Sequence, residues 1–301
     1  MTTHVIAVDV GGTEMKAALV AVEPGTATPL REIRQPTPRG DGPILDAVRG
    51  LVESLRGGVE LAAAGVVVPG VVDERTGVGI YSANLGWRDL PIRDRLAEQL
   101  DVPVILGHDV RAGGLAEARL GAARGLRDVA VLPIGTGIAA ALILGGALHT
   151  GGGRAGEIGH VDVGHGERCG CGRTGCLEAV ASSAAIARRY RARSGEPAAG
   201  GAEVVAALRD GDPHAAAVWQ DAVDGLARGL IVLAGVVAPE CVVLGGGLAR
   251  AGGLLVEPLT ARIDELLAPH HRKPRLELAE LGDTAGCLGA ALLATEGLTT
   301  A

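Results

Sequence analysis

Three of the five cysteines gather within eight residues, shortly after a histidine. Cys169, Cys171 and Cys176 follow His160 in the segment GEIGHVDVGHGERCGCGRTGCLE, which begins at Gly156. Three thiolates and an imidazole form a complete tetrahedral ligand set for Zn²⁺, with no position left for a catalytic water. The spacing therefore predicts a structural zinc site.

Composition limits the other function classes. The chain has 301 residues, a formal net charge of -7 and no basic block, so a nucleic-acid partner is not expected. The odd number of cysteines does not indicate a disulfide framework and fits a reducing cytosol. His4 leads directly into an apolar segment without a basic region before it, so we expect no signal peptide and a cytoplasmic location.

An uncharged run at residues 129–148 has the length of a membrane span. Pro133, Gly135, Gly137, Gly145 and Gly146 punctuate it at turn-like spacing, which argues against one continuous helix. Two buried strands are the favoured interpretation, and we expect no membrane association.

Glycine-rich turns recur where apolar strands end. The strand at residues 4–9 closes on Gly11-Gly12-Thr13, and the strand at 129–134 closes on Gly135-Thr136-Gly137. Glycine lets backbone N–H groups approach phosphate oxygens, a Thr hydroxyl adds a donor, and Asp9 at the strand end can hold Mg²⁺ through water. Gly245-Gly246-Gly247 ends a third strand and opens a helix, which suits a nucleoside. The strand–turn–strand pattern at residues 4–22 and 129–149 predicts a duplicated α/β architecture.

Hydrophobic periodicity and turn residues place the remaining elements. Further strands are expected at 15–22, 62–68, 102–106, 138–144 and 241–244, and helices at 42–56, 90–100, 109–120, 182–193, 202–209, 254–267 and 284–295. Asp212 and Pro213 are expected to begin a long helix as N-cap and first residue, and Pro239 to end it.

These motifs together resemble a known family. The three glycine turns, in this order, resemble the phosphate-1, phosphate-2 and adenosine motifs of the actin-like ATPase (ribonuclease H-like) fold. Glu157-Ile158-Gly159-His160 with the cysteine motif through Glu178 resembles the signature of the ROK family (repressors, open reading frames, kinases). The resemblance covers essentially the whole chain. It implies two lobes with a cleft between them.

The resemblance also implies an activity, that of an ATP-dependent hexose kinase. Asp109 would be the general base that accepts the proton of the glucose 6-hydroxyl as it attacks the γ-phosphate of ATP, which binds with Mg²⁺. Sugar hydroxyls would be bound by Asn84, His108, Asp109, Glu157, His160 and Glu178. ATP would be bound by Asp9, Gly11, Gly12, Thr13, Gly135, Thr136, Gly137, Gly245, Gly246 and Gly247. His108 stands where the family often has an Asn that touches the sugar.

Several expectations about organisation and alternatives follow from the same resemblance. A small lobe is expected at residues 1–112, joined by the last helix at about 288–301, and a large lobe at 113–287 with a zinc-binding loop at 157–178. A homodimer or homotetramer is expected. Within the kinases, N-acetylmannosamine, N-acetylglucosamine and fructose are alternative substrates, and polyphosphate is an alternative donor. A sugar-responsive repressor is a different class, disfavoured because only eight residues precede Asp9. A zinc-bearing sugar sensor is disfavoured by Asp109 and the two phosphate turns.

Overall fold

The computed structural model describes residues 2–300, and the chain divides into two compact units. The first unit comprises Met1–Arg124, Leu148–Ala155 and Asp283–Ala301, and the second comprises Gly125–Ala147 and Gly156–Gly282. The lobe boundary expected after residue 112 falls inside helix α3 (Asp109–Arg119), which belongs wholly to the first unit.

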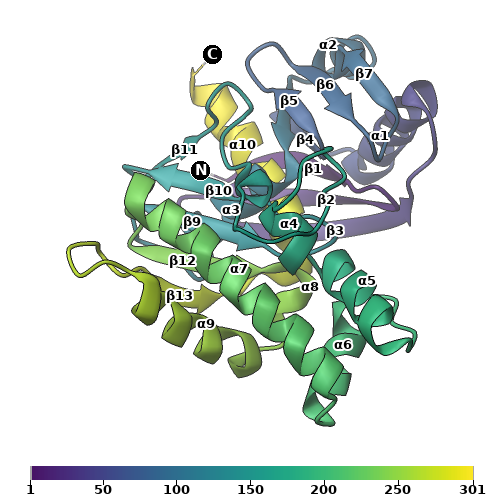
Figure 1. Cartoon of the computed structure of the whole chain (residues 1–301). Helices are drawn as coiled ribbons and strands as arrows, with labels where there is room; N and C mark the ends of the chain where they lie inside the picture. The colour runs from purple at the N-terminus through teal and green to yellow at the C-terminus, as the bar shows by residue number, and fades with distance from the viewer. Residues whose placement is uncertain (1, 301) are drawn as a thin grey trace. The chain divides into compact units, whose positions relative to one another are not determined.

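A five-stranded sheet forms the centre of the first unit, in the order β3-β2-β1-β4-β8 (Figure 1). The strands β1, β2 and β3 pair antiparallel, and β4 and β8 continue the sheet parallel to β1. Their bounds are Thr3–Val10 for β1, Glu14–Glu23 for β2, Thr26–Pro36 for β3, Ala63–Val68 for β4 and Val104–His108 for β8. Strand β3 was not predicted, because its residues are mostly exposed or half-buried and carry no apolar alternation strong enough to mark a strand.

Alternation along β1 decides which helix each side chain meets. Ile6, Val8 and Val10 belong to a core cluster with the apolar face of helix α1 (Asp41–Arg56). The other face of the sheet meets helix α10 (Ala285–Thr300), which packs on β1 and β4. A Cβ added at Gly65 would overlap the backbone of Ala290, so this helix approaches the sheet at backbone distance. Asp9 lies on that second face.

A small antiparallel sheet, β5-β6-β7, which was not predicted from the sequence, completes the first unit. Its strands are Val71–Asp73, Val78–Ser82 and Trp87–Leu90, too short for a periodic signal. The helix expected at 90–100 is shorter, because Leu90 still belongs to β7 and α2 spans Ile92–Ala97. A 3-10 helix, η2 (Gly282–Thr284), precedes α10.

The second unit repeats the sheet pattern in the order β11-β10-β9-β12-β13. Strand β9 pairs antiparallel with β10 and parallel with β12, as β1 does with β2 and β4, so the predicted duplicated α/β architecture is confirmed. The bounds are Val129–Pro133 for β9, Ala141–Leu144 for β10, Ala147–His149 for β11, Cys241–Gly245 for β12 and Arg275–Leu278 for β13. The uncharged run forms β9, β10 and β11. No helix within residues 2–300 is long and apolar enough to cross a membrane.

The second unit contains the helices expected at 182–193, 202–209 and 254–267 and the long helix from Pro213, together with α4 (Leu177–Ala181) and the 3-10 helix η1 (Ile158–His160), which were not predicted. The other helices are α5 (Ser183–Ser194), α6 (Gly201–Arg209), α7 (Pro213–Val237), α8 (Gly246–Ala249) and α9 (Gly253–Leu266). The predicted start of α7 is confirmed, since the Asp212 side chain accepts hydrogen bonds from the N–H groups of His214 at 2.7 Å and Ala215 at 3.1 Å.

Candidate functional site

The first glycine turn of the first unit is held by its own backbone and by one threonine. Gly11 N–H donates to the Glu14 carbonyl at 3.0 Å, and a Cβ at Gly11 would lie 2.6 Å from that oxygen. The Thr37 hydroxyl donates to the Gly11 carbonyl at 2.7 Å. Gly12 and Thr13 are exposed, and Gly12 lies beside Asn84, with 3.6 Å between an added Cβ and the Cβ of Asn84. The structure therefore brings Asn84 to this turn.

Two carboxylates of the first unit interact electrostatically. Asp9 ends β1 and Asp109 begins α3. Burial, and then the negative charge of Asp109, raise the pKa of Asp9 to about 6 against the opposing charge of Lys16. Asp9 is also covered by the start of α10, because a Cβ at Gly286 would overlap its carboxylate. The candidate metal-binding acid and the candidate base are therefore close enough to interact electrostatically.

The surroundings of Asp109 are partly enclosed. Its Oδ1 accepts a hydrogen bond from the Val110 N–H at 2.7 Å and lies 3.2 Å from Nδ1 of His108. The side chain of His108 is only 9% exposed, whereas that of Asp109 is 30% exposed. Asp109 can therefore reach a bound hydroxyl, whereas the His108 side chain is largely enclosed.

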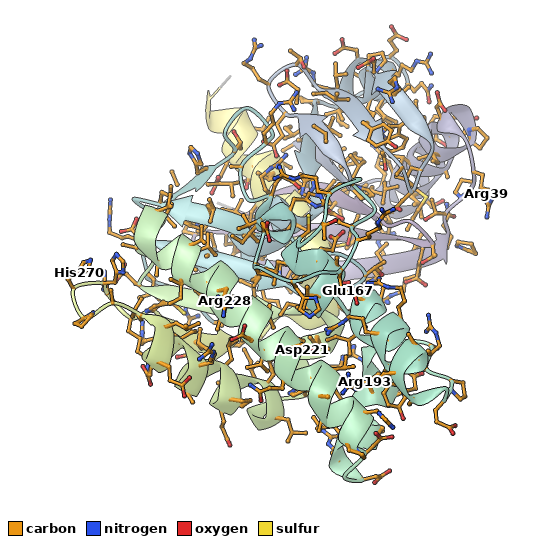
Figure 2. The ribbon with its side chains drawn as sticks, viewed as in Figure 1. Arg39, Glu167, Arg193, Asp221, Arg228 and His270 are labelled. Atoms are coloured by element: carbon orange, nitrogen blue, oxygen red, sulfur yellow. The ribbon has the colours of Figure 1, made fainter. Side chains whose placement is uncertain are left out.

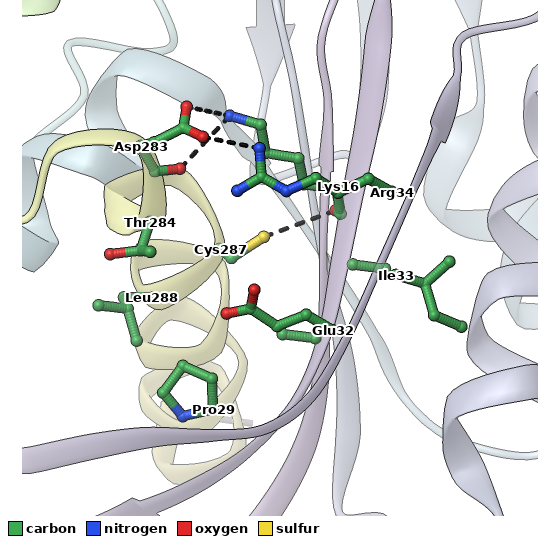
Figure 3. A pocket seen from close by; sticks show the side chains of 11 residues that line it. Lys16, Pro29, Glu32, Ile33, Arg34, Asp283, Thr284, Cys287 and Leu288 are labelled. Carbon is green, nitrogen blue, oxygen red and sulfur yellow. Dashed lines mark hydrogen bonds and ion pairs between the residues drawn. The ribbon is translucent and has the colours of Figure 1, made fainter.

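Asp283, Lys16 and Arg34 form a cluster of ion pairs in the same unit (Figure 3). Asp283 pairs with Lys16, which lies opposite Asp9 on β2, and with Arg34 at 2.8 Å. Hydrogen bonds from Lys16 and then Arg34 hold the pKa of Asp283 below its usual range. The side chain of Asp283 is 56% exposed, so these pairs contribute little to stability and mainly fix the position of Lys16.

In the second unit, Glu178 supports the second glycine turn. Gly135 N–H donates to the Gly137 carbonyl at 3.1 Å, and Oε2 of Glu178 accepts a hydrogen bond from the N–H of Ile138 at 2.9 Å. A Cβ at Gly137 would lie 2.7 Å from the same oxygen. The return strand β10 consequently begins at Ala141 instead of the expected Ile138.

The third glycine cluster lies against the second. Strand β12 is parallel to β9, with Gly245 opposite Pro133, and the Leu248 N–H donates to the Ile134 carbonyl at 3.1 Å. Gly246 has φ of 75°, and a Cβ there would lie 2.5 Å from the Ile134 carbonyl oxygen. Parallel strands thus bring the two glycine clusters together at one sheet edge, as expected for a nucleotide-binding surface.

The predicted zinc ligands converge. The ligand atoms of His160, Cys169, Cys171 and Cys176 all lie within 4.8 Å of one another. His160 Nδ1 is 3.8 Å from the Cys169 sulfur, and the sulfurs of Cys171 and Cys176 are 3.7 Å apart. A tetrahedral zinc with bonds of about 2.3 Å to sulfur spaces its ligand atoms by roughly 3.8 Å. The four residues therefore fit a zinc ion. His160 and Glu157 are exposed beside it.

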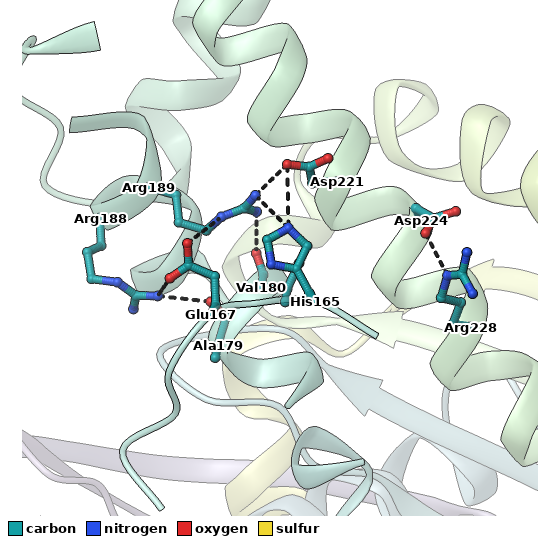
Figure 4. A network of polar contacts seen from close by, with 9 residues as sticks. All are labelled: His165, Glu167, Ala179, Val180, Arg188, Arg189, Asp221, Asp224 and Arg228. Atoms are coloured by element: carbon teal, nitrogen blue, oxygen red, sulfur yellow. Dashed lines mark hydrogen bonds and ion pairs between the residues drawn. The ribbon is translucent and has the colours of Figure 1, made fainter. Parts of the chain in front are cut away.

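Two arginines of α5 tie this loop to α4 (Figure 4). Arg188 pairs with Glu167 of the loop at 3.1 Å and donates to the Ala179 carbonyl at 2.9 Å. The buried Arg189 pairs with Asp221 of α7 at 2.5 Å and donates to the Val180 carbonyl at 3.2 Å. Glu167 and Asp221 are also labelled in Figure 2. These contacts hold the short helix that carries Glu178 against the metal loop.

The comparisons with known proteins agree with this geometry. The ROK family matches residues 5–297. The chain belongs to the ROK family. It is 33% identical over 312 residues to a glucokinase of Streptomyces coelicolor, covering 97% of each chain. It is 34% identical over 307 residues to an N-acetylmannosamine kinase of Escherichia coli O157:H7, covering 98% of each.

A solved structure extends the likeness to three dimensions. The ROK family glucokinase of Streptomyces griseus, in complex with glucose and AMPPNP, has a TM-score of 0.83 and 30% identity, with 98% of this chain and 100% of that chain covered. The expected family and the expected actin-like ATPase fold are confirmed by these matches.

Sequence reasoning missed the supports of the predicted site. Thr37 holds the first glycine turn and Glu74 holds the start of α3, yet each is far in the sequence from the residues that it contacts. Arg111 lies within α3 itself and pairs with Glu74. Arg111 offered one signal, since it is a charged residue among the small and apolar residues of a helix that begins at Asp109.

Proposed function

We propose that the chain is an ATP-dependent hexose kinase that phosphorylates the 6-hydroxyl of glucose. The observation that supports this proposal is the electrostatic interaction of two carboxylates in one unit, the partly exposed Asp109 and the more enclosed Asp9. Phosphoryl transfer depends mainly on positioning and on charge neutralisation, and two such carboxylates supply the base and the support for a metal-bound phosphate.

In the first unit, Asp109 would accept the proton of the attacking hydroxyl. Its side chain is exposed enough to meet a sugar, and the hydrogen bond from the Val110 N–H fixes the orientation of one carboxylate oxygen. Asn84 would hydrogen-bond another sugar hydroxyl from beside the glycine turn. Mg²⁺ bound with ATP would neutralise phosphate charge, and Asp9 would hold it through water.

In the second unit, Glu157, His160 and Glu178 would bind the remaining sugar hydroxyls. Nδ1 of His160 faces Cys169, which leaves Nε2 for a hydroxyl. A zinc ion held by His160 and the three cysteines would fix the orientation and tautomer of this ring. The glycines of both turns and of the third cluster would approach the phosphates and the nucleoside with their backbone.

N-acetylmannosamine is the second candidate substrate. A relative named N-acetylmannosamine kinase matches as fully as the glucokinases do, and the enclosed His108 occupies a position expected to contact the sugar.

We also propose a cytoplasmic location. The five cysteines, all within the described residues, form no disulfide bond, which suits a reducing compartment.

A coupled assay of ADP release across glucose, mannose, fructose, N-acetylglucosamine and N-acetylmannosamine tests the proposal. We expect the highest kcat/KM with glucose and ATP. A higher value with N-acetylmannosamine would favour the second candidate, and the absence of turnover with every sugar would overturn the kinase proposal.

A further inference from the structure

A buried arginine lies two residues after the proposed base. The Arg111 side chain is 2% exposed and donates to three different acceptors. Its Nε donates to Oε1 of Glu74 at 3.0 Å, and its terminal nitrogens donate to the carbonyls of Gly153 at 3.3 Å and Val72 at 3.4 Å. A buried guanidinium needs such partners, because removing it from water is costly.

The partner carboxylate also holds the other side of the base. Oε1 of Glu74 accepts a hydrogen bond from the backbone N–H of His108 at 3.3 Å, as well as from Arg111. Glu74 therefore contacts the residue before Asp109 and the residue two positions after it. One carboxylate oxygen thus fixes the chain on both sides of the proposed base.

The start of α3 needs this external support. Its N-cap is His108, whose side chain makes no capping hydrogen bond. A helix start without a side-chain cap leaves N–H groups to be satisfied by other partners. Glu74 supplies one such partner from the turn after β5, a turn that the Asp73 carboxylate shapes by accepting from the N–H groups of Arg75 at 3.0 Å and Thr76 at 3.2 Å.

The same arginine fixes the segment that precedes a second proposed sugar ligand. Gly153 has φ of 83°, and a Cβ there would overlap the carbonyl of Val72, so the two backbones lie in direct contact. Arg111 donates to both carbonyls and joins them. The chain continues from Gly153 to Glu157 within four residues.

We propose that Glu74 and Arg111 are positioning residues for phosphoryl transfer, which hold the carboxylate of Asp109 in the orientation that the reaction needs. The proposal rests on Asp109 being the base. A misplaced base lowers the rate of the chemical step, and a displacement of about 1 Å can cost on the order of 100-fold. Binding of ATP depends on other residues and should change little.

The test compares Glu74→Gln with a control on the same turn. Gln keeps the shape of Glu74 but weakens the bond to Arg111, so we expect kcat to fall about 30- to 100-fold, with KM for ATP within about two-fold of wild type. Arg111→Lys keeps the positive charge but loses the planar guanidinium, whose several N–H groups reach three acceptors at once. It should lower kcat by roughly 10-fold. Arg93→Met is the control, because Arg93 donates to the carbonyls of Arg75 at 3.1 Å and Thr76 at 2.8 Å and so supports this turn without touching Glu74.

Hydrogen exchange supplies a readout independent of turnover. In Glu74→Gln, the amides of residues 108–111 should exchange faster, and in Arg93→Met they should not. If Glu74→Gln does not fold, Glu74→Asp replaces it, because its shorter side chain cannot reach both partners. A kcat unchanged in the Glu74 variant, or lowered equally by Arg93→Met, would overturn the inference alone. A wild-type protein without turnover on any sugar would overturn the proposed function as well.

Discussion

The carboxylate of Glu178 accepts a hydrogen bond from the backbone of Ile138 at 2.9 Å, so an acid beside the cysteine loop also supports a glycine turn of the second unit. Glu178 follows Cys176 by two residues, and Ile138 follows Gly137. A side chain proposed to bind sugar therefore accepts a hydrogen bond from the turn proposed to bind phosphate. Under the proposed function, this hydrogen bond would let one residue influence the binding of both substrates.

Replacing Glu178 in two ways separates its two contacts. Gln retains an oxygen acceptor for Ile138 but weakens hydrogen bonds to sugar hydroxyls, so Glu178→Gln should raise the sugar KM about 10-fold and leave the ATP KM within about two-fold. Ala loses both contacts, so Glu178→Ala should raise both KM values. Steady-state kinetics with each substrate varied in turn measures this. An ATP KM that is equally unaffected in both variants would show that the contact with Ile138 has no role in ATP binding.

Two neighbouring glycines should respond differently to the same substitution. Gly246 has φ of 75° and an added Cβ would contact the Ile134 backbone, whereas Gly247 has open space around it. Gly246→Ala should lower the free energy of unfolding by about 2 kcal/mol or more, and Gly247→Ala should change it by less than about 0.5 kcal/mol. Denaturant unfolding of both variants measures the difference. Equal effects would contradict the close approach of Gly246 to Ile134.

Asp9 makes stability depend on pH. Its pKa is raised from 3.8 to about 6 in the folded protein, chiefly by burial, so the folded state binds more protons than the unfolded state between these values. The free energy of unfolding therefore falls as the pH rises through about 6. Once the Asp9 carboxylate is ionised in the folded protein, the loss amounts to about 3 kcal/mol. Asp9→Asn removes this cost while keeping the shape.

Thermal unfolding without nucleotide or Mg²⁺ checks this expectation. Asp9→Asn should unfold several degrees higher than wild type at pH 7.5, and at the same temperature as wild type near pH 4. The same variant should bind Mg²⁺–ATP more weakly. If the wild-type protein is as stable as Asp9→Asn at pH 7.5, ionisation of the Asp9 carboxylate does not lower the free energy of unfolding, and the expectation is wrong.

The cysteine cluster should hold one zinc ion per chain, bound by His160 and three cysteines. Cys171→Ala should abolish stoichiometric zinc and raise the sugar KM at least about 10-fold, because His160 loses its fixed orientation. Cys287→Ala is the control, since Cys287 lies in the first unit against the Lys16 carbonyl and should leave zinc content unchanged. The zinc content per chain of both purified variants, measured by metal analysis, tests this prediction. Full zinc content in Cys171→Ala would contradict the assigned ligand.

The sequence predicted those features that depend on local pattern. Apolar alternation and glycine turns identified β1, β2, β9 and β12, and Asp212 with Pro213 identified the start of α7. The convergence of His160 and the three cysteines was predictable because metal coordination requires particular residue types at short spacing. In contrast, β3 and β5 to β7 are short or largely exposed and carry weak periodic signals.

Contacts between distant segments could not be predicted in this way. The pairing of Glu74 with Arg111 depends on where the small sheet places the turn after β5, and the pairing of Thr37 with Gly11 depends on how β3 joins the five-stranded sheet. The raised pKa of Asp9 depends on α10, whose Gly286 lies against its carboxylate although it is far away in the sequence. Such supports become visible only when the fold is known.

The most direct test of the central claim is the turnover of Asp109→Asn with glucose and Mg²⁺–ATP, measured against wild type at equal zinc content. Asn keeps the shape of Asp109 and cannot accept the hydroxyl proton, so kcat should fall at least about 1,000-fold while zinc remains bound. Wild-type protein should release ADP and glucose 6-phosphate in equal amounts. Turnover in Asp109→Asn equal to that of wild type would contradict the assignment of Asp109 as the base.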